Sequence, residues 1–341
     1  MLEVYFALIR HGLVALVSNC PQFKWFSPFV FILFACAAVF LYQKPQLWFN
    51  LEMQNSFKTI AIIGKYMAPK ALQQMQADLV NLAQHLQSRN ITVYIEKNTA
   101  LHAPINGFKT IGLDEVGEIA DLAIVMGGDG TMLSVARSLI DADVPLVGIN
   151  RGRFGFLTDL RAEEMLVAVD RILAGGFSLE PRMLLATQII RDGKVLHANY
   201  ALNDAVIKSD LRLIELEVKI NQQFVHKQRS DGLIICTPTG TTAYAMSAGG
   251  PILHPNLDAI TLVPICPHTL SNRPIAVSSS SHIEVSLMQF DEAQLSFDGQ
   301  YQVALQIRDK VLVQRAEKTI SLLHPSDYCY FDMLRNKLNW G

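Results

Sequence analysis

The sequence predicts a two-part fold: an α/β domain with a parallel sheet, followed by a β-rich, sandwich-like domain. Two observations carry this prediction. Between residues 59 and 176, short apolar runs alternate with segments of helical periodicity, which is typical of strands and helices that build a parallel sheet. From residue 177 onward, alternating polar and apolar residues dominate and helical spacing is nearly absent. That pattern indicates antiparallel strands with one buried face.

In the first part, Leu and Met recur at steps of three and four over residues 71–89, which predicts an amphipathic helix. Helices are also predicted to begin at Thr131 and to cover residues 163–173, where Gly175 and Gly176 end the pattern. The predicted strands of this part are residues 59–63, 91–95, 122–126 and 144–149. In the second part, residues 214–220, 282–287 and 310–313 alternate as half-buried strands do.

Length and composition limit the class of protein. The 341 residues can fill two domains with ample core, and a net charge of -2 without any basic run does not favour a nucleic-acid partner. The five cysteines are scattered and form no Cys-x-x-Cys pair. We therefore expect a reduced, cytoplasmic protein with neither a disulfide framework nor a zinc site.

Residues 1–52 contain one apolar run, Phe26 to Tyr42, flanked by Lys24 and Lys44. As a helix this run would span roughly 25 Å, slightly short of a hydrocarbon core of about 30 Å, so a membrane anchor is marginal. A secretory signal fits less well, because no small-residue cleavage site follows Tyr42. A third interpretation, translation of an over-extended reading frame, also stays open at this point.

The segment from Asp121 to Ile140 organises the rest of the chain. A buried strand ends in Gly127-Gly128-Asp129-Gly130, and a helix follows. This layout suits phosphate binding, because glycines let the backbone approach a ligand and free N–H groups meet an anion. Asp129 would repel a phosphate unless it accepts a proton or holds a metal ion. A tight turn with a solvated Asp129 explains the same residues, and neither a Gly-x-Gly-x-x-Gly nor a P-loop motif is present.

Two connections in the β-rich part carry groups suited to a nucleotide. Asn203-Asp204 places an amide beside a carboxylate that can accept from two neighbouring ribose hydroxyls, although a plain turn is the simpler interpretation. Residues 229–251, RSDGLIICTPTGTTAYAMSAGGP, are rich in small residues that let a flat ligand approach the backbone. Within them, Asp231 offers a fixed acceptor and Tyr244 an aromatic face.

Two further connections are less specific by themselves. In PICPHTLSNRP, residues 264–274, Cys266 and His268 could face a pocket, but a buried thiol and a structural histidine are the simpler interpretations. Phe297 to Gln300, with sequence FDGQ, predicts a hairpin-type turn.

Several of these motifs resemble one known family. MGGDGT, residues 126–131, resembles the glycine-rich signature shared by NAD kinases, diacylglycerol and sphingoid lipid kinases and, more distantly, phosphofructokinases. GINRGRFGFL (148–157), residues 229–251, PICPHTLSNRP and the closing HPSDYCYFDMLRNKLNW resemble NAD kinases specifically, in the expected order from Phe57 to Trp340. Met53 and the residues after it look like the natural opening of such a kinase, so we favour the over-extended reading frame.

The resemblance implies transfer of the γ-phosphoryl group of ATP to the 2′-hydroxyl of the adenosine ribose of NAD, giving NADP. It implies Asp129 as the group that accepts the hydroxyl proton, Mg²⁺ or another divalent metal bound with ATP, and a homo-oligomer. It also divides the chain into the extension 1–52, an α/β domain 53–176, a dinucleotide-binding domain 177–320 and a closing segment 321–341 that returns to the first domain.

Site residues follow from the same resemblance. Arg229, two positions before Asp231, is linked in the family to the choice of dinucleotide, and a basic residue there favours NAD over NADH. Arg212 lies in a stretch that looks shorter than in relatives. The residues implied to contact NAD are Asp129, Gly130, Asn203, Asp204, Arg212, Arg229, Asp231, Thr242, Ala243, Tyr244, Ala245, Met246, Ser247, Cys266 and Gln300.

Two alternatives share part of this pattern. A lipid kinase of the same superfamily would explain GGDGT, but not TPTGTTAY or PHTLSNRP. A regulator that binds NADP(H) without catalysis would need the same pocket with an idle Asp129. Incubation with ATP, Mg²⁺ and NAD, coupled to an NADP-specific dehydrogenase, separates all three.

Overall fold

A computed structural model describes residues 57–64, 69–152, 155–209, 211–269, 271–289 and 293–340. The predictions for residues 1–52, including the run from Phe26 to Tyr42, lie outside these residues. Within the described part, no helix is both long enough and apolar enough to cross a membrane.

The first part is a parallel sheet with strand order β5-β4-β1-β2-β3. Its central strand β4 is buried along its whole length, because helices cover both faces of such a sheet. Its strands are β1 (Thr59–Gly64), β2 (Thr92–Glu96), β3 (Lys109–Ile111), β4 (Leu122–Gly127), β5 (Leu146–Asn150) and β6 (Leu160–Arg161). Its helices and 3-10 turns are α5 (Pro69–Ser88), α6 (Lys97–His102), η2 (Leu113–Glu115), α7 (Val116–Ile119), α8 (Asp129–Ser138), η3 (Ala162–Glu164) and α9 (Met165–Leu173).

The second part is built from antiparallel strands, as predicted. They are β7 (Phe177–Arg191), β8 (Lys194–Ala201), β9 (Asp204–Lys208), β10 (Ile214–Ile220), β11 (Gln223–Ser230), β12 (Gly232–Cys236), β13 (Ala259–Ile265), β14 (Ile275–Ser278), β15 (Ile283–Gln289), β16 (Ala293–Phe297), β17 (Tyr301–Leu305) and β18 (Lys310–Pro325). Only η4 (Thr239–Thr242), α10 (Tyr244–Ser247) and the closing helix α11 (Tyr330–Leu338) interrupt them among the described residues.

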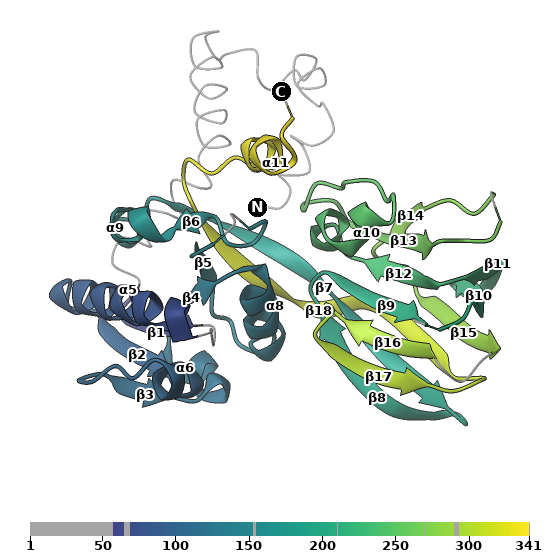
Figure 1. The fold of residues 1–341 in the computed structure, drawn as a ribbon, viewed down its shortest axis with the longest axis horizontal. Coiled ribbons are helices and arrows are strands. Elements are labelled where there is room, and N and C mark those ends of the chain that lie inside the picture. Colours follow the sequence, from purple (N-terminus) through teal and green to yellow (C-terminus); the bar gives the residue numbers. More distant parts are fainter. Residues whose placement is uncertain are drawn as a thin grey trace, which may run out of the picture. The chain divides into compact units, whose positions relative to one another are not determined.

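Two long strands join the parts. β7 and β18 pair antiparallel along their length, and β18 also pairs with β5 in parallel at Leu322 and Leu146. Figure 1 shows this pair running from the α/β part into the β-rich part. The parallel sheet and half of the sandwich are therefore one 12-stranded sheet. The predicted strand at residues 310–313 is only the start of β18, which continues past a register shift between Arg315 and Thr319.

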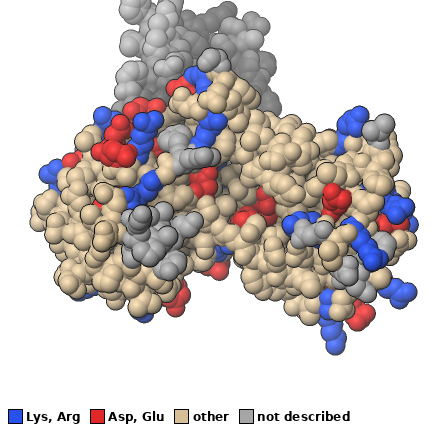
Figure 2. Space-filling view, in the orientation of Figure 1, with Lys and Arg blue, Asp and Glu red and all other residues tan. Residues whose placement is uncertain are grey.

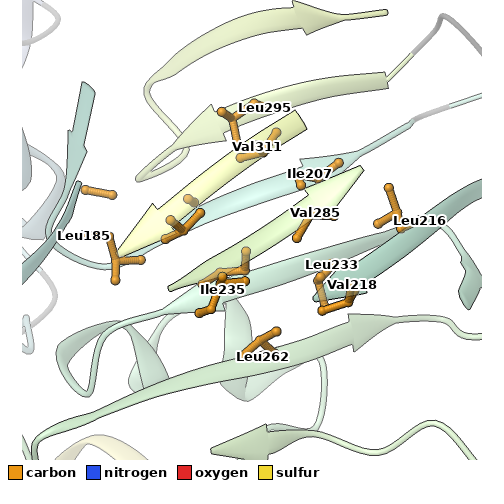
Figure 3. Close-up of a cluster of buried hydrophobic side chains, with 14 of the residues drawn as sticks. Leu185, Ile207, Leu216, Val218, Leu233, Ile235, Leu262, Val285, Leu295 and Val311 are labelled. Atoms are coloured by element: carbon orange, nitrogen blue, oxygen red, sulfur yellow. The ribbon is translucent and has the colours of Figure 1, made fainter. Parts of the chain in front are cut away.

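The second sheet has six strands in the order β14-β13-β12-β9-β16-β17 and packs face to face on the first. Leu216, Leu233, Val285 and Leu295 lie between the two layers with other apolar side chains (Figure 3). The alternation of β10 supplies every second residue to this core, as the period-2 pattern predicts. The fold prediction, an α/β domain followed by a β-sandwich-like domain, is confirmed.

The outer face of the six-stranded sheet is covered where α10 packs on it. Ala245 of α10 is fully buried against Val206, Ile234 and Val263. This explains why β12 is buried on both faces although it belongs to a sandwich. The short helix also makes the rim of the candidate site.

Candidate active site

The glycine turn after β4 places Asp129 at the first position of α8, with Gly128 as the N-cap. The Asp129 carboxylate accepts hydrogen bonds from Phe156 N at 2.7 Å, Leu157 N at 3.0 Å and the Thr158 hydroxyl at 3.2 Å. A Cβ at Gly155 would overlap Asp129 Oδ1, so only glycine permits this approach. Asp129 is therefore held in one orientation by the loop of residues 155–158.

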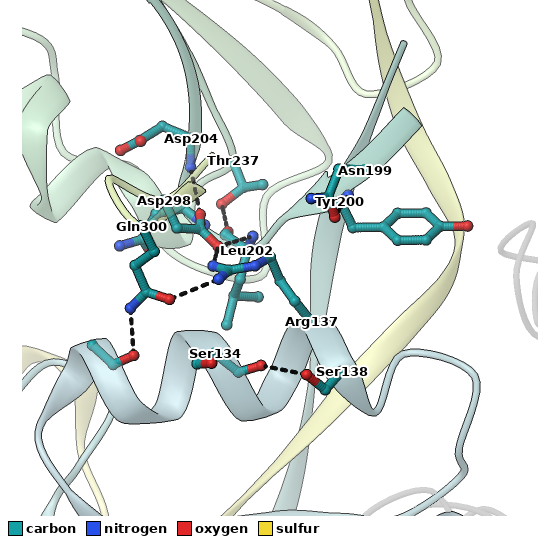
Figure 4. Close-up of polar contacts among 12 residues, drawn as sticks. Ser134, Arg137, Ser138, Asn199, Tyr200, Leu202, Asp204, Thr237, Asp298 and Gln300 are labelled. Carbon is teal, nitrogen blue, oxygen red and sulfur yellow. Dashed lines mark hydrogen bonds and ion pairs between the residues drawn. The ribbon is translucent and has the colours of Figure 1, made fainter. Parts of the chain in front are cut away.

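A buried ion pair ties α8 to the β-rich part. Arg137, two turns after Asp129, donates from Nη1 to Asp298 Oδ2 at 2.5 Å, and the Asp298 side chain is fully buried. The same carboxylate accepts from three consecutive amides, Leu202 N at 3.1 Å, Asn203 N at 2.7 Å and Asp204 N at 3.1 Å. Figure 4 shows Arg137 rising from the helix toward Asp298. Asp298 thus fixes the backbone of the Asn203-Asp204 pair.

Gln300 adds a second contact between the turn after β16 and the start of α8. Arg137 Nη2 donates to Gln300 Oε1 at 2.6 Å, and Gln300 Nε2 donates to the carbonyl of Gly130 at 2.5 Å (Figure 4). The turn between β16 and β17 makes this possible, because Asp298 and Gly299 both have positive φ (51° and 66°) and reverse the chain tightly.

A pocket of about 290 Å³ opens on the outer face of the six-stranded sheet. Asp204, Val206 and Lys208 face it from β9, because alternate residues of a strand share one face. Asn203, Ala243, Tyr244, Ser296, Asp298, Gly299 and Gln302 complete its lining. The ring of Tyr244 is 42% exposed, so it can pack against a ligand.

Asp204 has unusual electrostatics for a pocket residue. It is only 4% exposed, and burial together with the Asp298 charge raises its pKa to about 7. A carboxyl with such a pKa can bind or lose a proton near neutral pH when a polar ligand contacts it.

The TPTGTT turn is anchored to the same segment. Thr237 donates from its hydroxyl to Leu202 O at 2.6 Å, and Thr237 N donates to Asn203 O at 2.9 Å. A Cβ at Gly240 would overlap the Asn203 carbonyl, so a glycine is required for this packing. The turn and the Asn203-Asp204 pair therefore form one rigid wall of the pocket.

Comparisons with known proteins agree with this geometry. The ATP-NAD kinase N-terminal domain model matches residues 61–177, and the ATP-NAD kinase C-terminal domain model matches residues 202–324. The NAD kinase of Thiobacillus denitrificans is 50% identical over 291 residues, which cover 85% of this chain and 99% of that protein. The NAD kinase of Nitrosomonas europaea is 48% identical over 287 residues, covering 84% and 96%.

The chain belongs to the NAD kinase family. The predicted activity, that of an ATP-dependent NAD kinase, is thereby confirmed over the lipid-kinase alternative. Solved structures share the fold. A yeast NADH kinase complexed with NADH gives a TM-score of 0.75 at 24% identity, covering 83% of this chain and 88% of that one. An NAD kinase from Archaeoglobus fulgidus in complex with ATP gives 0.64 at 23% identity, covering 82% and 97%.

The structure of this NAD kinase brings together part of the residue set that the sequence implied. Asp129, Gly130 and Gln300 meet at the start of α8, and Asn203, Asp204, Ala243 and Tyr244 line the pocket. Two members make structural contacts. The Ala245 side chain of α10 is buried against the six-stranded sheet, and the Thr242 hydroxyl donates to Thr239 O at 3.2 Å. Met246 is half-buried and Ser247 exposed in α10.

A second group gathers at the other end of β9, around Ser209. Arg212 N donates to Ser209 Oγ at 3.3 Å, and Ser209 N donates to Asp231 O at 3.0 Å. The exposed Cys266 thiol donates a hydrogen bond to the Asp231 carboxylate, and this bond, together with the carboxylate charge, raises the pKa of the thiol. Arg229 is exposed at the end of β11, and its carbonyl accepts from His268 N at 3.0 Å. Arg212, Arg229, Asp231 and Cys266 therefore do not line the pocket beside Asp204.

Several residues of the candidate site were not predicted from the sequence. Arg137 lies in the helix predicted to begin at Thr131, and nothing in one sequence reveals that it reaches Asp298, 161 positions away. Asp298 lies inside the FDGQ motif, which offered a signal. Lys208, Ser296 and Gln302 line the pocket through strand alternation, which becomes readable only when the sheet order is known.

The closing helix α11 packs on the loop of residues 155–158 that binds Asp129, called here the Asp129 loop. Phe156 of this loop packs against Tyr330, Met333 and Leu334 of α11, and Lys337 Nζ lies 5.3 Å from the centre of the Phe156 ring. Burial lowers the pKa of Lys337, while the Asp129 carboxylate acts in the opposite direction. The last helix thus contributes a cation whose charge interacts with the Asp129 carboxylate.

Proposed function

We propose that Asp129 accepts the proton of the 2′-hydroxyl of the adenosine ribose of NAD while the γ-phosphoryl group of ATP is transferred to that oxygen. One observation carries this proposal: three hydrogen bonds fix the carboxylate at a helix N-terminus that Gln300 joins to the dinucleotide pocket. Oδ2 takes one of these bonds and keeps a second lone pair for a substrate hydroxyl.

The remaining requirements of phosphoryl transfer are positioning and charge neutralisation. The free amides at the start of α8 suit the phosphate groups. Asn203 and Asp204 would hold ribose hydroxyls, and Tyr244 would pack on a flat ring of NAD. Arg212, Arg229, Asp231, Cys266 and the small residues of α10 would contact the part of the dinucleotide that extends along β9 and α10.

Mg²⁺ bound with ATP fits the donor set. Mg²⁺ is commonly held by one or two carboxylates together with substrate phosphates and water. Among the described residues no group of three or more His, Cys, Asp or Glu side chains is arranged to hold a metal ion by itself, and Asp129 is the carboxylate at the glycine turn. The metal would supply charge neutralisation on the phosphoryl oxygens.

The assay that tests the proposal contains ATP, Mg²⁺ and NAD and is coupled to an NADP-specific dehydrogenase. We expect NADP to form only with all three present. When NADH replaces NAD, the product is NADPH, which is measured directly by chromatography, and its rate of formation should be lower if Arg229 selects the oxidised form. Failure to form NADP, with NAD binding intact, would reject the assigned reaction.

We also propose a homo-oligomer in the cytoplasm. The edge strand β11 exposes Phe224 and Val225, and apolar side chains on an open sheet edge favour pairing with a second copy. Light scattering on the purified enzyme tests the assembly, and cell fractionation tests the location.

A further inference from the structure

Four charged side chains form a buried cluster beneath the active site: Asp159, Glu180, Arg182 and His324. His324 Nδ1 and Asp159 Oδ2 are 2.8 Å apart, and His324 Nε2 lies 3.3 Å from Glu180 Oε2. Arg182 Nη2 donates to the same Glu180 oxygen at 2.9 Å. The side chains of Arg182 and His324 are 2% and 3% exposed, so this cluster is inside the protein.

Burial and ion pairing act in opposite directions on the pKa values of His324 and Glu180. Burial disfavours the charged form of His324, but its contacts with Asp159 and Glu180 nevertheless raise its pKa. Burial likewise opposes ionisation of Glu180, yet His324 and Arg182 lower its pKa. His324 and Arg182 therefore each lie against a carboxyl group. Tyr328 stacks on the His324 ring, with ring centres 4.0 Å apart and planes at 10°.

The two ends of the cluster belong to the two sides of the active site. Asp159 follows Thr158, whose hydroxyl binds Asp129. At the other end Arg182 Nη1 donates to Thr239 Oγ1 at 3.3 Å, and Thr239 opens the turn that leads into the pocket residues Ala243 and Tyr244. Around a small cavity of about 10 Å³, Phe156 and Leu157 of the Asp129 loop meet Thr239 and Thr242.

Stability alone does not account for such a cluster. Buried ion pairs stabilise little compared with apolar residues of the same size, because desolvation offsets their attraction. They do impose fixed distances and directions, since each member has few other partners in the interior. Phosphoryl transfer depends on such fixed geometry, because a displacement of about 1 Å can lower a rate by about 100-fold.

We infer that Asp159, Glu180, Arg182 and His324 are positioning residues that keep the loop holding Asp129 in register with the turn that forms the dinucleotide wall. This inference rests on the function proposed above for Asp129. The cluster connects β18, β7 and the Asp129 loop to the TPTGTT turn, so motion of one side is transmitted to the other.

The test compares His324→Gln and Glu180→Gln with Arg191→Met in the full-length enzyme. Arg191 is the matched control. It ends β7 and forms a bidentate pair at 2.8 and 2.7 Å with the buried Asp309, the residue just before β18, at the other end of the paired strands. kcat, the KM for NAD and the thermal midpoint are measured for each. We expect all three variants to lose thermal stability, but only the two cluster variants to lose kcat, by about 10-fold or more.

Equal kcat values in wild type, cluster variants and Arg191→Met, with lowered midpoints, would overturn the inference and leave the cluster a structural role. If His324→Gln does not fold, Glu180→Gln is decisive, because it keeps the shape of its side chain and removes only one charge. Arg182→Lys should recover part of the kcat lost in Arg182→Met, whereas equal losses would count against positioning. A wild-type enzyme that forms no NADP would instead overturn the proposed reaction itself, so the two failures are distinguishable.

Discussion

Gln300 donates a hydrogen bond to the carbonyl of Gly130, so the turn that lines the pocket touches the residue next to Asp129. These two residues are 170 positions apart, and no sequence periodicity relates them. Their contact makes the helix N-terminus and the pocket one site, from which the following predictions are derived.

Asp129→Asn should lower kcat by roughly 10²–10⁴-fold with NAD binding largely kept, because the amide cannot accept the hydroxyl proton. One amide of the 155–158 loop would also face the new NH₂ group, so some stability should be lost. Thr158→Val is the matched control, since it removes a hydrogen bond to Asp129 but keeps the carboxylate. Its kcat should fall less than about 10-fold. Turnover of Asp129→Asn at the wild-type rate would remove Asp129 from the mechanism.

Tyr244→Ala should raise the KM for NAD and leave the KM for ATP nearly unchanged. Loss of ring packing costs about 1–3 kcal/mol by analogy with base stacking on aromatic residues. Tyr301→Ala serves as control, because Tyr301 is similarly exposed but contacts His197 and does not line the pocket. Steady-state kinetics with each substrate varied decide the matter, and an unchanged KM for NAD would place Tyr244 outside the site.

Arg137→Met should lower the free energy of unfolding by about 3–5 kcal/mol, because it leaves the Asp298 carboxylate buried without its cation. The KM for NAD should rise as well, since Asp298 fixes the amides of Asn203 and Asp204. Denaturant titration and kinetics measure the two effects. Adding Asp298→Asn to Arg137→Met should restore part of the stability. A double variant with a lower free energy of unfolding than Arg137→Met alone would contradict this account.

Asp204 should make stability fall as pH rises from about 4 to about 7. Its pKa is raised to about 7 in the folded protein, whereas an unfolded Asp titrates near 3.9, so the folded state binds the proton more tightly over this window. Asp204→Asn lacks this component. The unfolding free energy of Asp204→Asn minus that of the wild type should therefore increase as pH rises, by on the order of a few kcal/mol. Denaturant titrations at about pH 5 and pH 8 measure this difference. If it is the same at both pH values, the pKa of Asp204 is not raised in the folded protein.

The same carboxyl should link NAD binding to pH. If ribose hydroxyls donate to the charged form, bound NAD favours loss of the proton, and the KM for NAD should fall as pH rises through about 7. The Asp204→Asn variant should lack this trend. A KM that does not change with pH in the wild type would separate Asp204 from the ribose.

The sequence by itself determined most element types and the location of the glycine turn that carries Asp129. The apolar run Leu122–Met126 before a glycine turn predicted a buried strand, and the alternation of residues 214–220 predicted which side chains enter the core. These are local patterns, set by the period of a strand and the conformational freedom of glycine. The motifs from MGGDGT to PICPHTLSNRP also identified the family without knowledge of the fold.

Tertiary structure alone decided which motif residues meet. The length of β7 and β18, and their continuation into the parallel sheet, depend on pairing between segments more than 100 residues apart. The Arg137–Asp298 pair, the outward face of β9 and the buried cluster around His324 exist for the same reason. Long-range contacts form where two surfaces fit, and one sequence carries no local record of its distant partner. The sequence therefore named Asp129 and Asp204, and only the folded chain showed what holds each of them in place.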